Sequence, residues 1–308
     1  MKIRTLTTIL LAAFGTLAFS CSRESGQDTT LRTITFTADD FILAEDALPG
    51  TKTSLSGNSG FVWSAADTAG VFPSTGAQVY FTMEAGAGAS SAPFDGGGWG
   101  LLASEDYYSY YPFVGDIYLN RNKIPVSYMG QKQVGPSSSA HMGKCDFMYS
   151  KGELQGQDLG FNYHHMSCII RANVTLPAGT YTKFAVTAPS NLFVTKGWFN
   201  LMAETPTIVG TLYSNQLGID LESVTSDGST SFYIYIMSAP VNLQGLEITV
   251  SALNSERKEY QCKKTPSSVY NAGTISGLKC IDWTEVPQSM GLILEEWGEG
   301  GHITGNAD

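Results

Sequence analysis

The sequence has few of the residues that carry most catalysis and nucleic-acid binding. Only 15% of its 308 residues are charged, four are histidine, and 28 acidic against 18 basic side chains give a formal net charge of −10. No cluster of Lys and Arg is present to bind a phosphate backbone, so we expect no nucleic acid as a partner. The chain also lacks G-x-S-x-G, H-E-x-x-H and C-x-x-C motifs. We therefore expect no enzyme, no cofactor and no metal site.

Long apolar runs are absent except at the N-terminus. Residues 1–20 begin with two basic residues, continue as an apolar stretch and end with small residues before Cys21, which is the layout of a secretory signal. The segment Leu17–Cys21 is similar to a bacterial lipobox, which favours lipidation of Cys21; cleavage by an ordinary signal peptidase is the alternative. Residues 21–30 are polar and are expected to tether the lipid to the first strand.

Cysteine is scarce as well. Besides Cys21 the chain has four cysteines, Cys145, Cys168, Cys262 and Cys280. An even number in an exported protein permits disulfides, and the short loops that they would close favour the pairs Cys145–Cys168 and Cys262–Cys280. Zinc is the competing interpretation, but these residues lack the tight spacing that a zinc site uses.

Glycine, tyrosine and phenylalanine are abundant, with 33, 15 and 15 residues. This composition is typical of short aromatic strands joined by tight turns. Polar and apolar residues alternate in several segments; over residues 33–38 the alternation places Ile34, Phe36 and Ala38 on one buried face. No long helical stripe is found. The sequence thus predicts an all-β protein built from antiparallel sandwiches.

A polar, glycine-bearing stretch near residues 150–160 divides the chain. We expect one β-sandwich over residues 31–155 and a second over 156–285, each of ordinary domain size. Residues 286–308 form a glycine-rich tail. Its short apolar run, Leu292, Ile293 and Leu294, is suited to pairing at the edge of a sheet.

The run Tyr107–Tyr111 has two interpretations. Exposed tyrosines there, together with Trp99, would make a stacking platform for sugars, and the protein would then be a surface glycan-binding lipoprotein of a nutrient-uptake system. Core packing on at least one face of the strand is the favoured interpretation.

His164 and His165 are neighbours on an expected strand, so they point to opposite faces and do not ligate one metal together. The phase of residues 170–176 predicts that His164 shares the core face with Cys168, while His165 points outward. A structural histidine is the favoured interpretation.

Taken in order, several motifs of the chain resemble the fimbrillin-like lipoproteins of Bacteroidales, which are the subunits and anchors of type V pili. The resemblance spans nearly all of the chain after the signal and is carried by Ile34–Ala38, Thr51–Leu55, Val62–Phe72, Tyr107–Pro112, Asp146–Tyr149 and Phe161–Ile170. In that family the fold is a tandem of two transthyretin-like β-sandwich domains.

The resemblance also implies a role in assembly. Fimbrillin-like stalk subunits are exported as lipoproteins and cut after a basic residue, and the strand that they lose is replaced by the C-terminal strand of a neighbour. Here residues 32–38 would be the removable strand, Lys52 the processing site, and Leu292, Ile293 and Leu294 part of the donor strand. The implied partners are other pilus subunits (identical or paralogous), the outer membrane through the lipid on Cys21, and a ligand on a host or bacterial surface.

Overall fold

The computed structural model describes residues 33–44, 60–96, 104, 106–115 and 119–287. These residues form twenty strands and one short 3-10 helix, η1 (Met142–Lys144), with no α-helix among them. The predicted all-β class is confirmed. Within the described ranges, no helix has the length and apolar character needed to cross a membrane.

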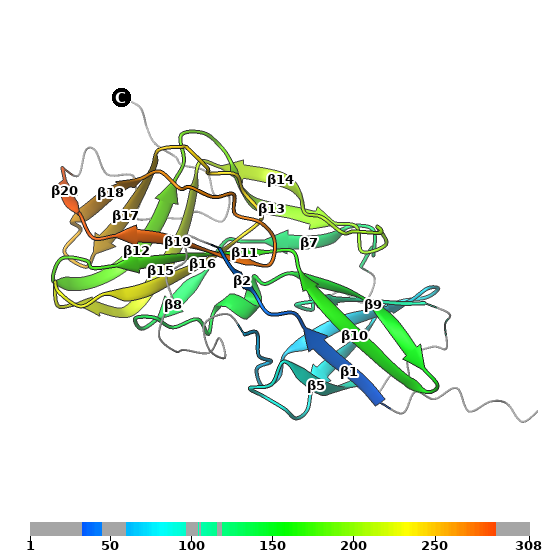
Figure 1. Ribbon diagram of the computed structural model, residues 1–308. Coiled ribbons are helices and arrows are strands. Elements are labelled where there is room, and N and C mark those ends of the chain that lie inside the picture. The colour runs from blue at the N-terminus through cyan, green and yellow to red at the C-terminus, as the bar shows by residue number, and fades with distance from the viewer. Residues whose placement is uncertain (1–32, 45–59, 97–103, 105, 116–118, 288–308) are drawn as a thin grey trace, which may run out of the picture.

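Seven strands close into a barrel in one half of the molecule (Figure 1). Their order around the barrel is β1-β10-β9-β6-β3-β4-β5. The strands are β1 (Thr33–Ala38), β3 (Thr68–Pro73), β4 (Val79–Met83), β5 (Ser91–Gly96), β6 (Tyr107–Tyr111), β9 (Met148–Gln155) and β10 (Asp158–His165).

Three further sheets build the other half. A four-stranded sheet has the order β16-β11-β19-β2 and comprises β2 (Ile42–Leu43), β11 (Cys168–Val174), β16 (Phe232–Ser238) and β19 (Thr274–Cys280). A six-stranded sheet has the order β20-β18-β17-β12-β15-β8 and comprises β8 (Lys132–Val134), β12 (Gly179–Thr187), β15 (Gln216–Ser226), β17 (Ile248–Asn254), β18 (Glu259–Lys264) and β20 (Thr284–Val286). A three-stranded sheet has the order β14-β13-β7, from β7 (Ile124–Ser127), β13 (Phe193–Phe199) and β14 (Val209–Ser214).

The barrel and two of the other three sheets are mixed, whereas the sequence analysis expected antiparallel ones; only the sheet β14-β13-β7 is purely antiparallel among them. The pairs β1–β10, β11–β19, β15–β8 and β19–β2 are all parallel. Parallel neighbours need long crossover connections, and in each of these pairs the two strands are far apart in the sequence. Alternation of polar and apolar residues reports which face of a strand is buried but carries no information on the direction of its partner.

The boundary expected between residues 155 and 156 does not separate the sheets. It falls in the turn of the β9–β10 hairpin, and both strands belong to the barrel. Gly156 has φ of 69° and takes the first position of a two-residue turn, so the polar glycine-bearing stretch is a hairpin tip and not a linker. The chain leaves the barrel after His165, and β2, β7 and β8, although early in the sequence, pair with strands of the other half.

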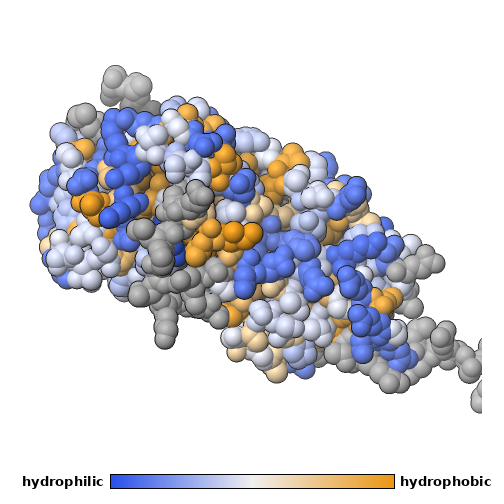
Figure 2. Space-filling view, viewed as in Figure 1, coloured by the Kyte–Doolittle hydropathy of each residue, from blue (hydrophilic) through white to orange (hydrophobic). Residues whose placement is uncertain are grey.

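Hydrophobic residues on the face shown in Figure 2 gather in small separate groups among hydrophilic ones. The large apolar side chains that are exposed come from different strands and loops, namely Ile42, Val134, Leu154, Val209, Tyr213 and Ile281. Single exposed apolar residues of this kind are normal on a soluble surface. The apolar faces are instead turned inward, into a core that includes residues of both halves.

Strand β3 has a glycine at position 70, where the neighbouring residues leave no room for a side chain. The ring of Tyr110, from the neighbouring strand β6, lies directly over Gly70, and its hydroxyl donates to Gln78 Oε1 at 2.8 Å. A Cβ at residue 70 would collide with that ring and lie 2.8 Å from Gln78 Oε1. Tyr110 is only 1% exposed, so it has little room to move away.

We predict that Gly70→Ala lowers the free energy of unfolding by about 1–3 kcal/mol, because the added methyl overpacks the barrel wall. Urea denaturation measures the change. Gly160→Ala is the matched control: it makes the same substitution in a barrel strand, where the nearest atom is the Glu153 carbonyl oxygen at 3.9 Å. Equal stabilities of the two variants would contradict this account of Gly70.

Candidate functional site

Strand β1 is the piece of chain that closes the barrel. It pairs in parallel with β10 along its whole length, from Thr33 opposite Asp158 to Ala38 opposite Tyr163. On its other side it pairs antiparallel with β5 through three residues centred on Phe36. Without β1, both β10 and β5 would present rows of unpaired backbone N–H and C=O groups, which is the arrangement that recruits another strand.

The inward face of β1 carries the side chains expected from the sequence. Phe36 is fully buried, Ala38 is 5% exposed, and Ile34 packs half-buried against the core. The Phe36 ring contacts four other rings at centroid distances of 4.2 to 6.2 Å, those of Phe81, Phe94, Phe161 and Tyr163. One side chain of this strand therefore occupies the centre of the barrel's aromatic core.

Trp63 ties the backbone of β1 to the loop before β5. Its Nε1–H donates to the carbonyl oxygens of Phe36 and Ser90, both at 3.1 Å. The indole is 1% exposed and packs edge-on against Phe94 and Tyr163. Because a buried Trp N–H needs an acceptor, the Trp of the Val62–Phe72 motif and strand β1 depend on each other.

The residues that follow β1 make a second anchor, at His165. The His165 ring bonds through Nε2 to the Asp39 carbonyl oxygen at 2.8 Å and through Nδ1 to Asp146 Oδ1 at 2.9 Å. The Phe41 ring stacks on it, with centroids 3.8 Å apart. The His165 and Asp146 side chains are 1% and 3% exposed, so this group is a buried cluster where the barrel meets the second half.

The hydrogen bonds define the charge of this cluster. The Asp39 carbonyl only accepts, and a carboxylate at Asp146 only accepts, so both contacts are satisfied together when the two ring nitrogens of His165 carry protons. Burial by itself lowers the pKa of His165, but the charge of Asp146 and the hydrogen bonds to Asp146 and Asp39 outweigh it and raise the pKa above its usual value. The cluster is therefore a buried ion pair.

We predict a pH-dependent contribution of His165 to stability. Because its pKa is raised in the folded state, the stabilisation is complete below the ordinary histidine pKa of about 6.5 and is lost as the pH rises through the raised value. His165→Gln should lower the free energy of unfolding by about 3–5 kcal/mol at pH 6, since it leaves Asp146 buried without its counter-ion. The difference in the free energy of unfolding between this variant and the parent protein should become smaller as the pH rises.

His164→Gln is the matched control for this measurement. His164 is the adjacent residue and forms an exposed pair with Asp39 Oδ2, its side chain being 54% exposed. An exposed pair contributes only about 0–1 kcal/mol, so this variant should stay close to the parent at every pH. A gap for His165→Gln that does not change with pH would contradict the ion-pair assignment.

The expectation for the two histidines was wrong: His165 is buried and His164 is exposed. The prediction extended the alternation of residues 170–176 back to the two histidines. Met166 and Ser167 lie between β10 and β11, however, and interrupt that alternation. The signal was available within β10 itself, where Leu159, Phe161, Tyr163 and His165 alternate with polar residues. The Asp39–His165–Asp146 cluster was missed because its members are 19 and 126 residues apart.

The four described cysteines are all buried and are free thiols in this structure. Burial raises the pKa of Cys145 and of Cys168 to about 12. Cys262 on β18 and Cys280 on β19 hydrogen-bond to each other; the bond from Cys280 holds the pKa of Cys262 below its usual value, and that of Cys280 is raised. Both disulfide pairings stay predictions, but for Cys262 and Cys280 the two thiols are already in contact.

We predict that oxidised glutathione links Cys262 to Cys280, because the Cys262 thiolate is the better nucleophile and has its partner beside it. Peptide mapping by mass spectrometry without reduction detects the link. Cys262→Ser should abolish it, and Cys145→Ser, the matched control, should leave it intact. Recovery of both thiols in reduced form after prolonged oxidation would contradict the prediction.

The tyrosine run of β6 is part of the core. Tyr107, Tyr110 and Tyr111 are 2%, 1% and 4% exposed, so they do not form a stacking platform for sugars. Tyr108 is partly exposed, but the Lys151 ammonium lies over its ring. Core packing, the favoured interpretation, is confirmed, and the glycan-binding alternative loses the tyrosine run as a support. Trp99, its other support, lies outside the described residues.

Other expected site residues also lie outside the described residues, namely Cys21, Lys52, Leu292, Ile293 and Leu294. Lipidation, processing and strand donation therefore stay predictions. In the part of the chain that is described, no three or more His, Cys, Asp or Glu side chains gather in a way that could hold a metal ion.

Solved structures of other proteins superpose on this chain. No family model and no curated protein matches the sequence. A candidate cell adhesion protein from Bacteroides ovatus superposes with a TM-score of 0.52 at 12% identity, over 83% of this chain and 96% of that one. Another from Bacteroides uniformis superposes with a TM-score of 0.50 at 14% identity, over 73% of this chain and 92% of that one. A fimbrial protein from Bacteroides ovatus superposes with a TM-score of 0.38 at 12% identity, over 80% of this chain and 47% of that one.

The first two matches cover most of both chains, whereas the third score is too low to support an argument. At these identities a likeness establishes fold and not activity. This chain therefore has the fold found in candidate cell adhesion proteins of Bacteroides.

Proposed function

We propose that this protein is a structural or adhesive subunit of a type V-like pilus, without catalytic activity, exported as a lipoprotein and held at the outer membrane through Cys21. The observation that supports it most is the position of β1, a single strand that closes the barrel and precedes the segment containing Lys52. Lys52 is the one basic residue between Thr33 and Ser59. The fold shared with candidate cell adhesion proteins supports the same role.

In this proposal the protein is a tandem of two transthyretin-like units. The first unit corresponds to the barrel and the second to the other three sheets, with the division after His165 in place of residue 155. The subunit joins its partners, which are identical or paralogous pilus subunits, by exchanging β1 for a neighbour's strand.

Cleavage after Lys52 would free β1, and replacement of β1 is the demanding step. The incoming strand must pair with β5 and β10 and must fill the space left by Phe36. Leaving that space empty would cost about 3–5 kcal/mol, the usual penalty of deleting a buried Phe side chain. The apolar run Leu292, Ile293 and Leu294 is the segment of this chain suited to enter the corresponding groove of the next subunit.

The same cut would also release β2. This strand pairs with the edge of β19, with Ile42 N–H donating to the Gly273 carbonyl at 2.8 Å and Ala44 N–H to the Ile275 carbonyl at 2.9 Å. Ile42 is 70% exposed, so β2 adds backbone bonds but little apolar burial. The released segment thus bridges both units, and its loss would open the barrel and expose a second strand edge.

The proposal predicts processing followed by polymerisation. We expect a trypsin-like protease to cut the mature protein after Lys52, giving a new N-terminus at Thr53, and the product to form oligomers detectable by light scattering. Lys52→Gln should keep the N-terminal segment and stay monomeric. A chain ending at Met290 should be cut normally but stay monomeric, because it has a groove and no donor.

Two results would count against strand exchange. Cut material that stays monomeric although the donor segment is present would contradict it directly. Surface-exposed material that always keeps the segment from Cys21 onward, as seen by mass spectrometry, would instead favour an anchor or tip role over a stalk role. A surface ligand on a host or bacterial cell would then be the partner of an adhesive tip.

A further inference from the structure

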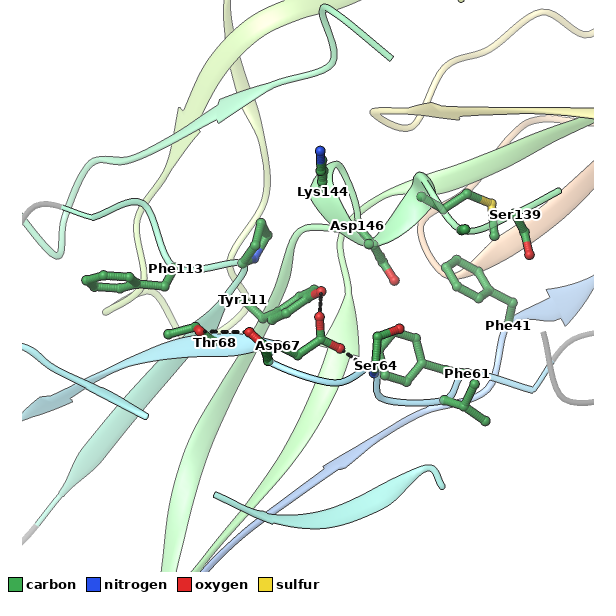
Figure 3. Close-up of a pocket in the computed structure, with 16 residues that line it drawn as sticks. Phe41, Phe61, Ser64, Asp67, Thr68, Tyr111, Phe113, Ser139, Lys144 and Asp146 are labelled. Atoms are coloured by element: carbon green, nitrogen blue, oxygen red, sulfur yellow. Dashed lines mark hydrogen bonds between the residues drawn. The ribbon is translucent and has the colours of Figure 1, made fainter. Parts of the chain in front are cut away.

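A cavity of about 420 Å³ lies between the barrel and the segment that carries η1. Figure 3 shows Asp67 and Tyr111 on one side of it, with Phe61 below, and Asp146 and Phe41 facing them. The cavity shares only Tyr111 with the tyrosine run, and none of the residues of β1 lines it. Its lining combines aromatic rings with two carboxylates.

The carboxylates give the cavity its charge. Asp67 accepts from the Tyr111 hydroxyl at 2.9 Å and from the Ser64 backbone N–H at 2.7 Å. Burial raises the pKa of Asp67, although these hydrogen bonds lower it, and the charge of Asp146 raises it further. Burial and the nearby Asp146 thus both disfavour the charged form of Asp67, and a cation bound beside Asp67 would relieve this.

The rings give the cavity its apolar walls. Phe41, Phe61 and Tyr111 are 3%, 7% and 4% exposed, and Phe113 is half-buried at the rim. Aromatic faces attract cations, and the attraction is stronger away from water. An apolar ligand without charge would cover Asp67 and leave it without compensation, which is costly.

An anionic ligand fits poorly. Lys144 is the one basic residue in the lining, and its ammonium points away from Asp67 and Asp146 in Figure 3. The imidazolium of His165 is already committed to Asp146 and to the Asp39 carbonyl. The lining therefore selects for positive charge.

We propose that this cavity binds an organic cation, a guanidinium or alkylammonium on an apolar stem, as in the side chain of Arg or Lys. The charged end lies against Asp67, the lining carboxylate that His165 does not neutralise, and the stem lies against Phe41 and Phe61. The source is either a free amino acid or a basic side chain of another protein. The inference concerns the intact chain and does not depend on cleavage or strand exchange.

Calorimetric titration with Nα-acetyl-arginine methylamide tests the proposal, with the citrulline analogue as a neutral ligand of the same shape. We expect the arginine compound to bind at least about tenfold more tightly than the citrulline compound, a difference of about 1.4 kcal/mol. Asp67→Asn should remove most of that difference. Asp220→Asn is the matched control and should keep the difference, because Asp220 on β15 is an exposed carboxylate paired with Lys183 on β12.

A second variant keeps the test decisive if Asp67→Asn folds poorly. Ala140 lines the cavity and is exposed, so Ala140→Trp should block entry without disturbing the core and should abolish binding. A short arginine-containing peptide that binds more tightly than the single amino acid identifies a protein partner as the source; the reverse order identifies a free amino acid. Equal binding of the arginine and citrulline compounds, binding of neutral sugars instead, or no saturation by any of them would overturn the proposal.

Discussion

The structure depends on strand β1, which lies between β10 and β5 and closes the barrel. β1 forms parallel backbone pairs with β10 and antiparallel pairs with β5, and Phe36 places a phenyl ring among four others at the centre. Backbone pairing is indifferent to side-chain identity, so any extended segment with an apolar residue at the right place satisfies the same groups. That property lets one strand serve as a structural element and, in our proposal, as a site of assembly.

The contacts around β1 explain several residues of the motifs found in the sequence. Trp63 donates to the carbonyl of Phe36, and Gly70 leaves room for the ring of Tyr110. Ser109, in the middle of the tyrosine run, bonds to the Tyr163 hydroxyl and donates to the Gly70 carbonyl at 2.9 Å. These residues are far apart in the chain and meet because β3, β6 and β10 lie in one barrel wall or face one another across its core.

The junction between the two halves depends on a different interaction. The imidazolium of His165 joins Asp146, near η1, to the backbone of Asp39, between β1 and β2. β1 and the residues after it are thus held by apolar burial at Phe36 and by the hydrogen bond from the buried His165 to the Asp39 carbonyl. The cavity beside it shares Asp146 and Phe41 with this junction, so events at the segment and at the cavity involve the same side chains.

The sequence by itself determined the all-β class and the inward face of β1, because alternation of polar and apolar residues is a local signal, and it favoured core packing of the tyrosine run. Only the tertiary structure decided the direction of β1 against β10, the place where the chain leaves the barrel, and which histidine is buried. Each of these depends on pairing between distant segments or on a two-residue break in phase at Met166 and Ser167. The spacing of Cys262 and Cys280 favoured them as a pair, but their contact, like the cavity beside Asp67, depends on packing, because these residues meet only when separate sheets and loops come together.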